Sequence, residues 1–103
     1  MLPVTHPGCR CAHLFEYRIP EDAFSEWDTL NPPGFVYGES AADPDYFVND
    51  YCVISAWEDR AMICEAAIRY PSEWWESHPR ILAKLQMMES VLQTYVPDMQ
   101  LMP

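Results

Sequence analysis

Residues 79–95, PRILAKLQMMESVLQTY, carry the longest amphipathic pattern in the chain. Apolar side chains recur along this stretch every three or four residues, as one face of an α-helix requires. They are Ile81, Leu82, Leu85, Met88, Val91, Leu92 and Tyr95. The pattern predicts a helix that packs its apolar face into the core, and Pro97 ends it. An adaptable, methionine-containing groove for a partner is the alternative interpretation.

Three further helices are expected upstream of this one. Ser55 followed by Glu58 is a capping-box pattern and predicts a helix over residues 57–70, which Pro71 ends. Apolar spacing also favours helices over residues 9–19 and 21–30. Turn-forming residues predict an irregular stretch at 31–50. The expected fold is therefore mainly α, with about four helices: an irregular N-terminal segment at 1–12 and a single helical domain at 13–103.

Composition limits the classes of partner. The chain has 103 residues, half of them hydrophobic, and a formal net charge of −10. This charge repels phosphate backbones and anionic lipid surfaces, which disfavours binding to nucleic acid or to a membrane. No apolar run approaches the roughly 20 residues of a membrane span, and no signal peptide is recognisable, so a cytoplasmic location is expected. In that compartment Cys52 and Cys64, which lie in apolar stretches, are expected to be free buried thiols.

The segment DYFVNDYCVISAWEDRAMICE, residues 45–65, holds the most chemistry. Glu58 opens a predicted helix, and Tyr51 precedes it by seven residues. A carboxylate and a phenol held together can serve metal ligation and oxyanion stabilisation. A solvated helix start beside a packed tyrosine is the alternative. A rival cluster of soft ligands, which matches no structural zinc-finger spacing, lies near the N-terminus at His6, Cys9, Cys11 and His13.

Several pieces of this sequence, in order, resemble a family. They are Glu26-Trp27, then Asn31-Pro32-Pro33-Gly34-Phe35-Val36-Tyr37, then Tyr46-Phe47-Val48 and Tyr51, and finally Glu58-Asp59-Arg60-Ala61. Over roughly residues 13–96 the chain is similar to the zinc-binding metallopeptidases of gut Firmicutes. These are relatives of the lethal-factor-like and Pro-Pro endopeptidase zincins. The resemblance implies the C-terminal helical part of a zincin catalytic domain, with zinc as cofactor and a peptide or protein as substrate.

The resemblance also implies roles for individual residues. Glu58 falls at the third zinc ligand, Tyr51 at the tyrosine that stabilises the oxyanion, and His13 at the second histidine of the His-Glu-x-x-His motif. Cys9 stands where the first histidine belongs, and its thiolate can still bind zinc. Arg10 stands at the general base, a role that a guanidinium cannot fill because it stays protonated. Met62 replaces a glutamate that the family usually has.

These departures predict a truncated or degenerate copy of a zinc metallopeptidase with little or no activity. The missing part would be the N-terminal subdomain, and its loss would leave open a secreted or cell-envelope location for the parent protein. A small acidic helical module for protein interaction is the alternative function. The sequence does not specify a substrate or an oligomeric state.

Overall fold

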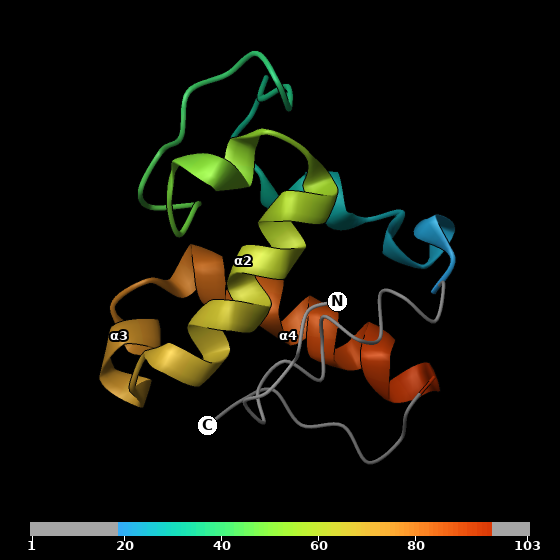
Figure 1. Ribbon diagram of the computed structural model, residues 1–103, viewed down its shortest axis with the longest axis vertical. Helices are drawn as coiled ribbons and strands as arrows, with labels where there is room; N and C mark the ends of the chain where they lie inside the picture. Colours follow the sequence, from blue (N-terminus) through green and yellow to red (C-terminus); the bar gives the residue numbers. More distant parts are fainter. Residues whose placement is uncertain (1–18, 96–103) are drawn as a thin grey trace, which may run out of the picture.

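The computed structural model describes residues 19–95, and this part of the chain is mainly helical (Figure 1). No β-strand occurs between residues 19 and 95, so the expected mainly α fold class is confirmed. The irregular segment expected at 1–12 and nearly all of the helix expected at 9–19 lie outside the described residues. Within residues 19–95, three short 3₁₀ helices precede three α-helices: η2 (Glu21–Phe24), η3 (Trp27–Leu30), η4 (Asp50–Val53), α2 (Ala56–Arg69), α3 (Ser72–Glu76) and α4 (Pro79–Tyr95).

The start of α2 agrees closely with the capping pattern in the sequence. Ser55 has extended backbone angles, and its hydroxyl oxygen accepts a hydrogen bond from the backbone N–H of Glu58 at 3.1 Å. This bond satisfies one of the four N–H groups that a helix leaves unpaired at its N-terminus. At the other end Tyr70 returns to an extended conformation, and Pro71 prevents the helix from continuing.

The helix α4 has the bounds that the amphipathic pattern predicts, and it forms one wall of the core (Figure 1). It crosses α2, which contributes Ile63, Cys64 and Ala66 to the same cluster. Met88 is fully buried there, so it is not available as a surface contact. The remaining buried members of the cluster come from the N-terminal turns, α3 and α4: Phe24, Trp27, Trp75, Ile81, Leu85 and Leu92.

The segment 21–30 differs from its prediction, because it forms two 3₁₀ turns instead of one α-helix. Its large apolar residues Phe24, Trp27 and Leu30 lie three apart, the spacing that a 3₁₀ helix aligns on one side. Thr29 also donates its hydroxyl hydrogen to the carbonyl of Glu26 at 2.6 Å, which supports the tight turn. The turn geometry thereby buries Phe24 and Trp27 together, with their rings edge to face.

The stretch 31–49 is irregular, as expected, and it connects the 3₁₀ turns to the helices. Two glycines in it, Gly34 and Gly38, adopt positive φ angles of 79° and 85°. The backbone N–H of Gly38 donates to the carbonyl of Val53 at 2.7 Å, which ties the loop to η4. None of the helices between residues 19 and 95 is long and apolar enough to cross a membrane.

Candidate functional site

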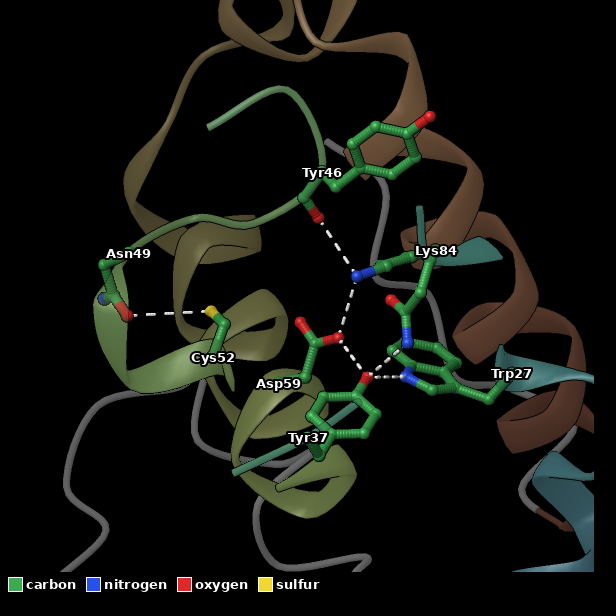
Figure 2. Close-up of polar contacts among 8 residues, drawn as sticks. Trp27, Tyr37, Tyr46, Asn49, Cys52, Asp59 and Lys84 are labelled. Carbon is green, nitrogen blue, oxygen red and sulfur yellow. Dashed lines mark hydrogen bonds and ion pairs between the residues drawn. The ribbon is translucent and has the colours of Figure 1, made fainter. Parts of the chain in front are cut away.

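A buried carboxylate, Asp59, is the centre of the polar structure in this protein (Figure 2). It lies in the first turn of α2 and has no exposed surface. Its Oδ2 accepts two hydrogen bonds, from the hydroxyl of Tyr37 at 2.7 Å and from Nζ of Lys84 at 2.8 Å. The three residues come from the loop, α2 and α4, so the network joins three distant parts of the sequence.

The hydroxyl of Tyr37 uses all of its hydrogen-bonding capacity. Its oxygen accepts from Nε1 of Trp27 at 2.9 Å and from Nδ2 of Asn31 at 3.0 Å, and its single hydrogen goes to Asp59. Burial, together with the negative charge of Asp59, raises the pKa of Tyr37 well above its usual range. The phenol therefore keeps its proton and acts as a fixed donor to the carboxylate.

Lys84 is the counter-charge of Asp59, and it is also fully buried. Besides the carboxylate, its ammonium group bonds to the backbone carbonyl of Tyr46 at 3.0 Å and lies 3.8 Å from the ring centre of Phe47. Burial raises the pKa of Asp59 and lowers that of Lys84, and the attraction between the two charges opposes both shifts. A carboxylate, a carbonyl and an aromatic face together replace the water that the ammonium group loses.

The pair of Asp59 and Lys84 is a closed structural site, because neither side chain has exposed surface that a substrate could reach. Sequence reasoning missed this site, because it gave Asp59 no role beyond the family resemblance. The signal was present in the helical spacing. Asp59 lies four residues before the buried Ile63, and Lys84 lies three residues after the buried Ile81. Opposite charges on two apolar helix faces indicate a buried pair.

The structure places the predicted catalytic tyrosine and metal-binding glutamate at the junction of η4 and α2. Tyr51 is 64% exposed, and its backbone N–H is held by Oδ1 of Asn49 at 2.9 Å. Glu58 is half-buried in the first turn of α2, directly before Asp59. No hydrogen bond joins Tyr51 to Glu58 among the described residues.

The other two predicted metal ligands, Cys9 and His13, lie outside the described residues. The proximity of His13 to Glu58 that a zincin site would require therefore stays a prediction. Between residues 19 and 95, no group of three or more histidine, cysteine, aspartate or glutamate side chains is arranged to hold a metal ion. Cys52 and Cys64 are buried, as the sequence predicts.

Comparisons of the sequence with protein-family models and with curated proteins, and of the structure with solved structures, found no significant match.

Proposed function

We propose that this chain is a degenerate relative of a zinc metallopeptidase, corresponding to the C-terminal helical part of its catalytic domain. In this proposal Glu58 is a metal ligand, Tyr51 is the side chain that faces a developing oxyanion, and His13 and Cys9 complete the metal site. The chain has little or no hydrolytic activity, because Arg10 occupies the position of the general base.

The buried network is the observation that supports this proposal. Four positions of the family resemblance, Trp27, Asn31, Tyr37 and Asp59, lie up to 32 residues apart and meet around one hydroxyl and one carboxylate. Such a network requires each of these residue types at its own position. It therefore explains, in structural terms, the order and spacing of the residues that carry the family resemblance. It also fixes the first turn of α2, where Glu58 is the neighbour of Asp59.

The proposed donor set fits zinc by its chemistry. A carboxylate, an imidazole and a thiolate are the three side-chain groups that zinc prefers in proteins. A zinc ion bound there would polarise a carbonyl group and lower the pKa of its bound water to about 7. General-base catalysis normally adds a factor of about 10²–10⁴, and the guanidinium of Arg10 cannot contribute it.

A zinc titration by calorimetry tests the role of Glu58. We expect Glu58→Gln to weaken zinc binding by at least about tenfold. Loss of a residue that only supports a metal ligand already costs about that much, and Glu58 is a proposed ligand itself. Glu65→Gln is the matched control, because Glu65 is an exposed glutamate on the same helix. Equal zinc affinity of wild type and Glu58→Gln would contradict the metal site. Chelator-sensitive cleavage of a peptide library by the wild type would contradict the predicted lack of activity.

A second candidate function, a module for protein interaction, is favoured by the surface. Three large apolar side chains at the η4–α2 junction, Tyr51, Ile54 and Trp57, are 64%, 56% and 50% exposed. Only two basic side chains among the described residues, Arg69 and Arg80, are exposed. In the same part of the chain ten carboxylates are exposed: Asp22, Glu26, Asp28, Glu39, Asp43, Asp45, Asp50, Glu65, Glu73 and Glu76.

An acidic surface with an apolar patch suits a cationic, amphipathic partner. The double substitution Ile54→Ser/Trp57→Ser separates the two candidates. The interaction module predicts that it weakens binding of a cationic amphipathic peptide. The proposed metallopeptidase relationship predicts that the double substitution leaves zinc affinity unchanged, since neither Ile54 nor Trp57 is a proposed ligand.

A further inference from the structure

The helix α2 is apolar on two of its sides, and only one of them faces the core. Ile63 and Ala66 are buried in the hydrophobic cluster that α2 shares with α4. Trp57 and Ile68, on another side of the same helix, are 50% and 44% exposed. A helix that is apolar beyond its core-facing stripe indicates a second surface to pack against. This outer side of α2 is therefore a candidate surface for a partner.

The apolar residues on the outer side follow one another at a regular spacing. At about 3.6 residues per turn, Ala61 and Ile68 lie about 40° and about 20° around the helix axis from Trp57. Together with Cys64 they occupy every fourth or third position from 57 to 68, and these four residues form the outer stripe. Alternating steps of three and four residues are the spacing with which one helix packs along another in a coiled coil. The outer stripe therefore fits a helix and not an extended peptide.

The two ends of the outer stripe project further than its middle. Trp57 and Ile68 are large side chains about 16 Å apart along the helix axis. Ala61 and Cys64, which lie between them, are small and less exposed. A second helix can therefore place an apolar side chain over the middle of the stripe, in the way that a knob enters a hole between packed helices.

Two glutamates beside the outer stripe determine the charge of a suitable partner. Glu58 and Glu65 lie about 100° and about 80° around the helix axis from Trp57, so they form an acidic row along one edge of the stripe. Ten carboxylates and only two basic side chains are exposed in the described part of the chain, so a second copy of the protein is repelled. A helix with basic residues next to its apolar side is attracted.

We propose that the outer stripe of α2 binds an amphipathic helix whose apolar side is flanked by lysine or arginine. The apolar side of this helix covers Trp57, Ala61 and Ile68, and its basic residues lie against Glu58 and Glu65. The inference rests on the second candidate function, the module for protein interaction. It goes further by giving the partner a helical conformation and by extending the binding surface from the η4–α2 junction along the whole of α2.

A pair of peptides that differ only in helix formation tests the conformation of the partner. The peptide LKKLLKLLKKLLKL has the same length as α2 and places leucine on one helical side and lysine on the other. Its diastereomer with four D-residues keeps the composition and the charge, but the mixed chirality prevents a helix. Fluorescence anisotropy of the labelled peptides, titrated with the full chain at about 0.15 M salt, compares the two affinities. We expect the diastereomer to bind at least tenfold more weakly.

Substitutions at the far end of α2 locate the binding face. Ile68→Ser is expected to weaken binding of the helical peptide at least fivefold, because it removes the apolar contact at that end of the outer stripe. Tyr95→Ser on α4 is the matched control, since Tyr95 is a large side chain of similar exposure, 47%, and its loss should leave the affinity unchanged. Glu65→Gln should weaken binding about two- to fivefold, as the loss of one exposed ion pair does. The dispersion of amide signals checks the fold of each variant.

The possible outcomes separate this inference from the interaction module on which it rests. Equal binding of the two peptides, or wild-type affinity of Ile68→Ser where Ile54→Ser/Trp57→Ser binds weakly, would overturn the helical partner and leave the module in place. Amide signals of the outer stripe that shift with protein concentration alone would assign the stripe to a second copy and also overturn the inference. Failure of both peptides to bind would overturn the module together with the inference.

Discussion

Asp59 and Lys84 carry opposite charges into a part of the protein that excludes water. Removing each charge from water costs several kcal/mol, and their mutual attraction offsets this only when other hydrogen bonds are made. Here Tyr37 donates to the carboxylate, and the carbonyl of Tyr46 accepts from the ammonium group. The pair therefore specifies how the loop, α2 and α4 fit together more than it stabilises the fold.

A double-mutant cycle measures how strongly these two charges depend on each other. Asp59→Asn and Lys84→Met should each reduce the free energy of unfolding by about 3–5 kcal/mol, because each leaves one buried charge without its partner. The double variant should lose much less than the sum of the two. Urea unfolding followed by far-ultraviolet circular dichroism provides the measurement. Additive losses would show that the charges do not interact. A single variant that fails to fold while the double variant folds would support the coupling.

Burial of the Cys52 thiol links stability to pH on the alkaline side. Burial is the main cause that raises the pKa of Cys52, from 9.0 to about 11. Between these two values the unfolded chain loses the thiol proton and the folded chain keeps it, so stability falls as the pH rises through this interval. From pH 8 to 10.5 this should cost about 2 kcal/mol, at about 1.4 kcal/mol per pKa unit.

The Cys52→Ala variant isolates this contribution, because it retains every other titrating group. We expect its free energy of unfolding to fall by about 2 kcal/mol less than that of the wild type over the same pH interval. Denaturant titrations at the two pH values give the comparison. Parallel losses in both proteins would mean that the thiol of Cys52 does not ionise differently in the two states.

Among the secondary-structure elements, the sequence correctly predicted the helices whose local sequence signals agree with the way they pack in the fold. The helix α4 follows from its apolar spacing, and α2 follows from the cap at Ser55. For residues 21–30 the predicted type of helix was wrong. Apolar residues three apart fit 3₁₀ turns as well as an α-helix, and the burial of Trp27 decides between these two conformations. The five-residue helix α3, which buries Trp75, was too short to show a period.

The predicted site and the observed network differ for a similar reason. The roles of Tyr51 and Glu58 follow from a resemblance and stay predictions, while the structure places both residues at the η4–α2 junction. The network around Asp59 depends on a contact between residues 59 and 84, which are 25 positions apart. Helical periodicity places each of these residues on an apolar face. It does not show that the two faces meet, which requires the packing of α2 on α4.

Charge is the property that governs the molecule as a whole. The chain has a formal net charge of −10, and Arg60 and Lys84 are buried, so the described surface is more acidic than the composition alone indicates. The molecule is also small, with a radius of gyration of 13.1 Å. At low ionic strength the Debye length is larger than this, so most of its carboxylates repel one another across the whole structure.

This repulsion predicts that salt stabilises the protein. Raising sodium chloride from about 0.01 M to about 1 M shortens the Debye length from about 30 Å to about 3 Å, which removes repulsion between surface charges but affects the buried pair much less. The melting temperature should therefore rise with salt. The triple variant Asp43→Asn/Asp45→Asn/Asp50→Asn removes three exposed charges from the loop and η4, so it should show a smaller rise. Thermal unfolding at several salt concentrations tests both expectations. A melting temperature that falls with salt would mean that attractive ion pairs, and not repulsion among carboxylates, dominate the surface.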